Sequence, residues 1–278
     1  MESGRAESVD LSPVADTTLH ALNPTFNMGG ELYFSMGATS KETRARALLK
    51  FDPAAVIPTN ATITNVVLEF HLPSLNRIDT TTVDYEFYRL LVDWGEGRKT
   101  GNTGSLATAG EATWNSPINS TPWSAPGAGQ GSDYSSTASM HGNLGPAPGT
   151  NSMPSTFRLT QDVQSWLNTP SQNFGWIGKA VDETVIQSAK RFSSRESGNG
   201  TILHVEFSVP EELRLTKAIS TNGGIFFEWT GGRPPYMIVS STNLLSGDWS
   251  LITTAFSGTN AFFLAPDDQR YFRVRELQ

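Results

Sequence analysis

Short runs in which apolar and polar residues alternate dominate the chain, and they predict β-strands. Successive side chains of a strand point to opposite faces, so alternation marks a strand with one buried face. Turn-forming Gly, Pro, Asn and Asp residues bound the runs. The clearest runs before residue 210 are ELYFSM from 31, RALLKFD from 46, TITNVVLEFHL from 62, VDYEFYRLL from 83, STFRLT from 155, FGWIGKA from 174, AKRFSSRE from 189 and TILHVEFSV from 201.

Helical periodicity is confined to one short segment, TQDVQSWLNT at 160–169. Val163, Trp166 and Leu167 would share one face of this helix, and Thr160 is a candidate N-cap. One short helix among about eight to ten strands predicts an all-β protein. The expected fold is a jelly-roll β-sandwich.

The end of the strand pattern predicts a second domain. A proline and a charged cluster follow the last strand of the first domain, in SVPEELRLTKAIS. Such a segment is typical of a domain boundary. We therefore expect a flexible leader at 1–10, the jelly roll at 11–209, a linker at 210–218 and a small β-sandwich domain at 219–278.

A long segment, residues 97–154, interrupts the strand pattern. It is rich in Gly, Ser, Thr, Asn, Ala and Pro, and it contains Trp114 and Trp123. Structureless loops of this length are uncommon in compact domains and are usually functional or partly ordered. The two tryptophans predict that the segment packs onto the sandwich, either as an inert loop or as part of a ligand site.

Composition narrows the class of protein. The 278 residues carry a formal net charge of -7, which argues against nucleic acid as the general partner. The absence of cysteine excludes disulfides and thiolate metal sites. No apolar run approaches the length of a membrane span, so membrane insertion is not expected. MESGRAESVD contains no apolar core of a signal peptide, yet the composition suits an exported bacterial protein.

Two basic stretches stand out against this acidic background. In RALLKFD, Arg46 and Lys50 share one face, and in AKRFSSRE, Arg191 and Arg195 share one face opposite Phe192. Arginine binds carboxylates and sulfates bidentately, and lysine acts as a point charge. If the two stretches lay on adjacent strands, the four cations would form a basic strip for an anionic polysaccharide, of the uronate or sulfated class.

Scaffold ion pairs are the alternative explanation of the basic residues. Arg195 would then pair with Glu196 or Asp16, and Arg46 with Asp52. Neutral sugars, by contrast, are usually bound on flat aromatic rings, and the long loop offers Trp123 and Tyr134 for this role. Buried aromatic anchors are common in sandwiches, so a structural role for both rings remains open.

The order of short motifs resembles the DNRLRE family of extracellular modules and the related alginate-binding carbohydrate-binding modules. The matching pieces are ADTTL from 15, NPTFNMGG from 23, RALLKFD from 46, IPTNATITNVVLEF from 57, DWGEG from 93, ATWNSPINSTPWSAPG from 112, LTQDVQSWL from 159, NFGWIGK from 173 and RFSSRES from 191. Met28 and Trp176 depart from the usual residues of the family. A weaker resemblance links YMIVSSTNLLSGDWSLI and QRYFRV to a C-terminal β module of secreted bacterial proteins.

The resemblance implies a jelly roll, location outside the cell or on its surface, and non-catalytic polysaccharide binding. It implies no required cofactor, but jelly-roll carbohydrate modules often hold a structural calcium ion through carboxylates and carbonyls. The candidate calcium ligands are Asp16, Asp52, Asp162 and Glu196. No EF-hand pattern occurs, and these residues are scattered along the chain.

Two other functions remain open from the sequence. A polysaccharide lyase or hydrolase could be built on a jelly roll, although neither H-E-x-x-H nor G-x-S-x-G occurs. GAGQGS at 127–132 lacks the lysine of a phosphate loop. A surface or filament protein is the other alternative, in which the leader would complete a neighbour's sheet, but the leader lacks alternating apolar residues.

Overall fold

The computed structural model describes residues 4–39, 41–73, 83–145, 148–221, 223–245, 247–264 and 270–277. These residues form two compact units. The larger unit is Ser8–Phe207, and the smaller one combines Met1–Glu7 with Ser208–Gln278. Each unit is described separately below.

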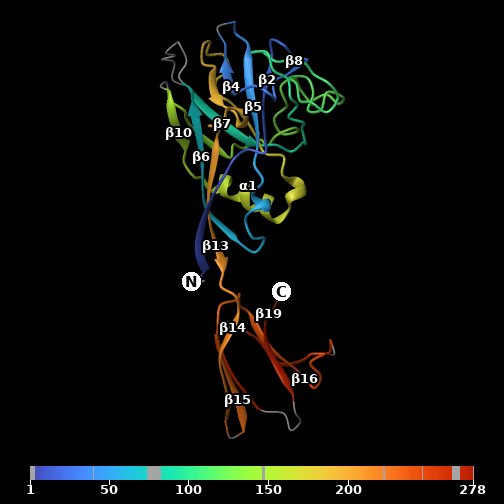
Figure 1. The fold of residues 1–278 in the computed structure, drawn as a ribbon, viewed down its shortest axis with the longest axis vertical. Helices are drawn as coiled ribbons and strands as arrows, with labels where there is room; N and C mark the ends of the chain where they lie inside the picture. The colour runs from blue at the N-terminus through green and yellow to red at the C-terminus, as the bar shows by residue number, and fades with distance from the viewer. Residues whose placement is uncertain are drawn as a thin grey trace. The chain divides into compact units, whose positions relative to one another are not determined.

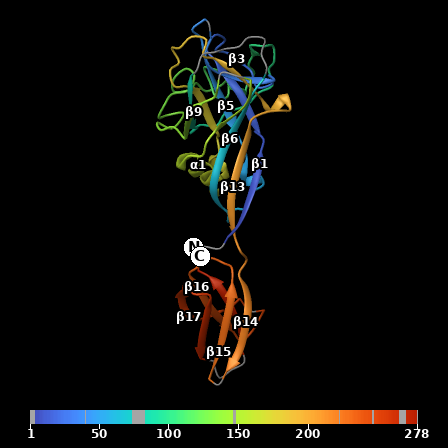
Figure 2. The ribbon, with the colours of Figure 1, turned by 90° about the vertical axis from the view of Figure 1, so that its left-hand side faces the viewer.

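A four-stranded sheet forms one layer of the larger unit. Its strands, in spatial order, are β1 (Gly4–Leu11), β13 (Ile202–Pro210), β6 (Thr62–Leu72) and β10 (Gly149–Met153). Figure 2 shows β1 and β13 side by side along most of their length. The expectation of a flexible leader at 1–10 is therefore wrong for residues 4–10, because hydrogen bonds to β13 hold them in the sheet; residues 1–3 lie outside the described residues.

A seven-stranded sheet forms the second layer (Figure 1). Its main path runs through β12 (Lys190–Ser193), β4 (Tyr33–Ala38), β5 (Arg44–Lys50), β11 (Trp176–Ala180), β7 (Asp84–Arg89) and β9 (Met140–Asn143). The seventh strand, β2 (Ala15–His20), pairs with β5 along its whole length. Most of the predicted strands are present, which confirms the all-β class and a sandwich-type fold.

An aromatic core joins the two layers. Phe70 of β6 lies 5.3 Å from Phe87 of β7 and 5.4 Å from Phe192 of β12, measured between ring centroids. Phe34 of β4 stacks on Phe192 at 5.5 Å. All four rings are fully buried, which at about 25 cal/mol per Å² of apolar surface makes this cluster a main source of stability.

The long segment covers the outer face of the larger sheet. Trp114 and Tyr134 from this segment pack with Leu48 of β5 and Ile177 of β11 in a second buried cluster. Part of the segment is regular: β8 (Ser105–Leu106) pairs with β3 (Phe26–Asn27), and it also supplies β9 and β10. Around Leu48 and Ile177, both faces of the seven-stranded sheet are therefore buried, one by the opposite sheet and one by this segment.

The one α-helix among the described residues, α1 (Phe157–Asn168), begins earlier than predicted. Thr156 is its N-cap and accepts a hydrogen bond from the backbone N–H of Leu159 at 3.0 Å, so Thr160 lies inside the helix. The predicted strand at STFRLT is accordingly the start of the helix. Val163, Trp166 and Leu167 are buried as predicted. Within the described ranges no helix has the length and apolar character needed to cross a membrane.

The described part of the larger unit also contains three short 3-10 helices: η1 (Pro53–Ala55), η2 (Pro170–Gln172) and η3 (Arg195–Ser197). The third of them matters for the sequence predictions. Strand β12 ends at Ser193 and Arg195 begins η3, so Arg191 and Arg195 do not share one face of a continuous strand.

The smaller unit contains two three-stranded sheets. The strands of the first are β14 (Arg214–Thr221), β15 (Gly224–Thr230) and β18 (Asn260–Leu264). Those of the second are β17 (Ser250–Phe256), β16 (Tyr236–Ser241) and β19 (Tyr271–Glu276). Phe227, Trp229, Tyr236, Ile238 and Phe263 form the core. The linker expected at 210–218 is wrong in its bounds, because β14 begins at Arg214.

Candidate functional site

Arg46, the first residue of the expected basic strip, is a buried anchor for the long segment. Its Nε and Nη2 atoms donate to the two carboxylate oxygens of Glu183 at 2.8 and 2.7 Å. Its Nη1 atom donates to the carbonyl oxygens of Gly127 and Ala128 at 2.7 and 3.1 Å. With 8% of Arg46 exposed, no surface remains for a ligand. The expected pairing with Asp52 is replaced by the pairing with Glu183.

The other strip residues do not lie beside Arg46. Strand β12 pairs with β4, where Arg191 lies opposite Ser35, and β4 separates β12 from β5. Lys50 forms an ion pair with Asp93, with 3.5 Å between Nζ and Oδ1. The guanidinium of Arg191 stacks over the Tyr33 ring at 3.9 Å. The four cations are therefore dispersed, and the basic strip on adjacent strands is wrong.

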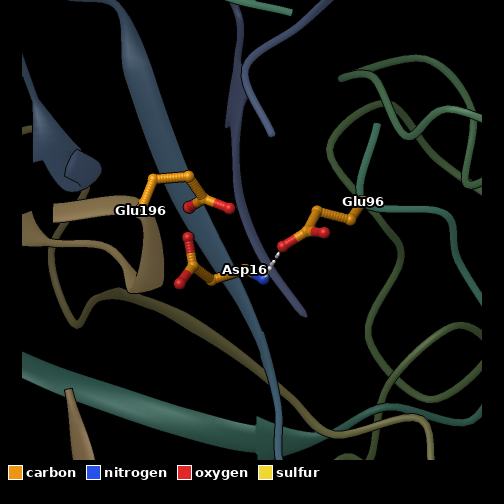
Figure 3. Close-up of side chains that lie close together, drawn as sticks. All are labelled: Asp16, Glu96 and Glu196. Carbon is orange, nitrogen blue, oxygen red and sulfur yellow. Dashed lines mark hydrogen bonds between the residues drawn. The ribbon is translucent and has the colours of Figure 1, made fainter. Parts of the chain in front are cut away.

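Asp16, Glu96 and Glu196 form an acidic cluster (Figure 3). Arg195, the fourth cation, contacts all three of these residues. Its side chain donates to both oxygens of Glu96, at 2.6 and 2.9 Å, and its Nε lies 3.0 Å from Glu196 Oε1. Its backbone N–H donates to Asp16 Oδ2 at 2.8 Å. The alternative of a scaffold ion pair between Arg195 and Glu196 or Asp16 is thus confirmed for Glu196, whereas Asp16 accepts from the backbone N–H of Arg195. Glu96 is the partner that sequence reasoning missed.

The pKa of Asp16 is raised to about 7, mainly by burial and also by the charges of Glu196 and Glu96, while the backbone hydrogen bond and the charge of Arg195 oppose the rise. The ligand oxygens of the three carboxyl groups lie within 4.8 Å of one another, as a cation site requires. However, the described contacts already engage both oxygens of Glu96, because Asp16 N–H also donates to Oε1 at 2.8 Å. Calcium takes six to eight oxygen ligands. The contacts of Arg195 therefore fit an arginine-bridged ion-pair cluster better than a calcium site.

The two remaining calcium candidates lie apart from this cluster. Asp52 precedes η1 and makes no side-chain cap hydrogen bond there. Asp162 is buried in α1, where its Oδ2 atom accepts hydrogen bonds from Ser139 Oγ at 2.5 Å and Trp176 Nε1 at 2.8 Å. The predicted set of four ligands is therefore wrong, because the fold brings only Asp16 and Glu196 together.

The two loop aromatics are structural. Trp123 is 4% exposed and Tyr134 is 3% exposed. Trp123 Nε1 donates to the carbonyl of Thr113 at 2.9 Å, and the Tyr134 ring lies 5.2 Å from the ring of Tyr88. Both rings fill the space between the long segment and the sheet. The prediction that they form a sugar-stacking platform is wrong for this reason.

A polar cavity beside α1 is the best candidate for a ligand site. It measures about 620 Å³ and lies between the end of β7, residues 135–139 and the helix. We call it the α1 cavity. Its described lining comprises two arginines, three side-chain amides, five hydroxyl side chains, one carboxyl group and one leucine. The arginines are Arg89 and Arg158, and the amides belong to Gln161, Gln164 and Asn168.

The charge of the α1 cavity is positive, in contrast to the acidic chain. Two guanidinium groups line it, and Asp162 is the one described carboxyl group in the lining. Burial raises the pKa of Asp162, which disfavours its negative charge. Arg89 Nη1 lies 3.9 Å from Asp162 Oδ1 and donates to Ser165 Oγ at 3.1 Å, so its guanidinium is held in place. The cavity therefore offers oriented donors to an anionic, hydroxyl-rich ligand.

The α1 cavity was not predicted, although the sequence contains a signal for it. Residues 158, 161, 165 and 168 follow helical spacing and are Arg, Gln, Ser and Asn, opposite the apolar stripe. A polar face with Arg158 as its one charged residue differs from the multiply charged faces that most surface helices turn toward solvent. What the sequence does not show is that Arg89 and residues 135–139 meet this face.

Comparisons with known proteins give little guidance. No family model matches the sequence, and no curated protein matches it. Among solved structures, the chain is similar to the crystal structure of a beta-1,2-glucanase from Parabacteroides distasonis, with a TM-score of 0.21 and 10% sequence identity. The match covers 98% of this chain and 35% of that chain. A similarity this low supports neither a fold assignment nor an activity.

Proposed function

We propose that the protein is a non-catalytic polysaccharide-binding protein for an anionic glycan, of the uronate or sulfated class, and that the α1 cavity binds the glycan. The observation that carries the proposal is the lining of this cavity. Guanidinium groups bind carboxylates and sulfates through paired hydrogen bonds, and amides and hydroxyls match sugar hydroxyls. The resemblance to the DNRLRE family agrees with this class of ligand.

The lining favours binding over turnover. Glycoside hydrolysis commonly needs two carboxyl groups on opposite sides of the scissile bond. In the part of the lining that the structure describes, Asp162 is the sole carboxyl group. Its Oδ2 atom already accepts hydrogen bonds from Ser139 and Trp176. The same part of the lining contains no His, Tyr or Lys that could act as the base of a lyase. A protein of this kind would act outside the cell or on its surface, where polysaccharides of this class occur.

The test compares binding of anionic and neutral polysaccharides at low and high salt. Alginate and pectate should bind, xylan and cellulose should bind weakly or not at all, and salt should weaken retention of the anionic pair. Arg158→Gln keeps the polarity of an exposed side chain and removes its charge. Since a hydrogen bond to a charged group contributes about 1.5–3 kcal/mol, this variant should bind roughly tenfold to a hundredfold more weakly.

Arg191→Gln is the matched control, because it removes an arginine from the same unit but far along the sheet path, on β12. It should bind as the native protein does. A loss of binding in this variant alone would show that the site lies on β12 and not at α1. Release of reducing ends or unsaturated uronates from any of the polysaccharides would contradict a non-catalytic role.

A further inference from the structure

Phe157, the first residue of α1, is the most exposed aromatic side chain of the larger unit among those described as exposed. It is 77% exposed, although the other large apolar residues of the helix are buried. Single exposed apolar residues are common and need no explanation by themselves. Two features of its position distinguish Phe157 from such a residue.

The first feature is its place on the helix surface. Residues three, four and seven positions apart lie on the same face of an α-helix. Phe157 therefore lies next to Gln161 and in line with Gln164, and both of these residues line the α1 cavity. Its sequence neighbour Arg158 also lines the cavity. The ring thus adjoins the lining at the N-terminal end of the helix.

The second feature is its distance from the other end of the lining. Arg89 hydrogen-bonds Ser165, which follows Phe157 by eight positions. At 1.5 Å per residue this separation is about 12 Å along the helix axis. A single sugar ring cannot reach from one level to the other, whereas a short oligosaccharide lying along the helix can.

We infer that Phe157 is an aromatic subsite of the α1 cavity and that the ligand is an oligosaccharide segment of a polyuronate, bound along α1. This inference rests on the proposed function and extends it to ligand length and orientation. One sugar places its carboxylate at Arg89, and a sugar further along the oligosaccharide lays its C–H-rich face on the Phe157 ring, beside Arg158. The exposed ring is apolar surface that becomes buried only when this second sugar is present.

The test measures affinity by calorimetry for oligouronates from the disaccharide to the hexasaccharide. The affinity of the native protein should rise with length until the ligand reaches both the arginines and the ring. Phe157→Ala should lower affinity for the longer oligomers roughly five- to tenfold, a size typical of aromatic contacts, and leave the disaccharide unaffected. Phe157→Tyr keeps the ring and should bind every length as the native protein does.

Leu264→Ala is the matched control, since Leu264 is also 77% exposed and lies in the smaller unit. It should change no affinity. If Phe157→Ala binds all lengths normally while Arg158→Gln binds none tightly, the aromatic subsite is overturned and the proposed function stands. If the native protein binds no oligouronate of any length, the proposed function and this inference both fail.

Discussion

Asp16 is expected to make the larger unit less stable as the pH rises, in contrast to the usual behaviour of a carboxylate. The side chain is 2% exposed, and its pKa is raised from 3.8 to about 7, first by burial and then by the neighbouring carboxylates. A raised pKa in the folded state means that the folded protein binds the proton more tightly than the unfolded chain. The free energy of unfolding should therefore fall between about pH 4 and pH 7 and level off above.

The size of the effect follows from the two pKa values. Their difference is about 3 units, and each unit corresponds to 1.36 kcal/mol, so the change in the free energy of unfolding is on the order of 4 kcal/mol.

Asp16→Asn removes the charge and keeps an oxygen that can accept the hydrogen bond from Arg195 N–H. Its amide nitrogen would face the acidic cluster, where Glu196 Oε2 is buried and has no hydrogen-bond partner among the described residues.

The assay is urea unfolding of the native protein and Asp16→Asn at several pH values between 5 and 8, followed by tryptophan fluorescence. Five of the seven tryptophans belong to the larger unit, so its transition dominates the signal. The variant should be the more stable protein at pH 8, and its stability should depend less on pH. Asp52→Asn, at a carboxyl group that makes no cap hydrogen bond, should keep the native slope.

Two results would refute this reasoning. A native protein whose stability rises between pH 5 and 7, or a variant with the native slope, would show that Asp16 is not the group that titrates. Calcium offers an independent check. If calcium raises the melting temperature of the native protein but not of Asp16→Asn, the acidic cluster binds a cation and is not an arginine-bridged ion-pair cluster.

Two further predictions concern the anchoring of the long segment and of α1. Arg46→Met leaves the largely buried Glu183 carboxylate, 11% exposed, without its bidentate partner, and the loss of unfolding free energy should be about 3–5 kcal/mol. Arg46→Met combined with Glu183→Gln should recover part of this loss in chemical denaturation. A single variant that loses less than about 1 kcal/mol would contradict this role. Thr156→Ala removes the N-cap of α1 and should lower the free energy of unfolding by about 1 kcal/mol, whereas Thr156→Ser should change it little. Equal thermal stability of both variants would contradict the role of this N-cap.

The fold was more predictable than the site because local patterns determine strands. Alternation placed Leu49 and Phe51 on the face opposite Arg46 and Leu48, as the structure has them. The same pattern cannot reveal that the long segment, residues 97–154, covers the face that carries Arg46. Arg46 was expected at the surface because an arginine on an outer face is usually solvated, and the long segment overturns that expectation by burying it.

Contacts between distant segments account for the remaining errors. The acidic cluster joins positions 80 to 179 residues apart, so the sequence could suggest Asp16 and Glu196 but not the part played by Glu96. The α1 cavity depends likewise on Arg89 meeting Ser165, 76 positions away. The start of α1 was missed because FRLT alternates as a strand does. In the structure the Thr156 side chain accepts a hydrogen bond from the backbone N–H of Leu159, and the helix begins at Phe157.

The pairing of β1 with β13 constrains how the larger unit can assemble during synthesis. Asp10 on β1 hydrogen-bonds His204 on β13 at 2.7 Å, across 194 positions of the chain. Strand β13 also lies between β1 and β6, so neither of these two strands is fully paired until β13 emerges from the ribosome. A nascent chain that stops before Ile202 would expose unpaired strand edges, which promote aggregation. Folding of this unit is thus expected to be slow and to follow translation of the whole sandwich, leaving a long interval in which the chain needs protection by chaperones.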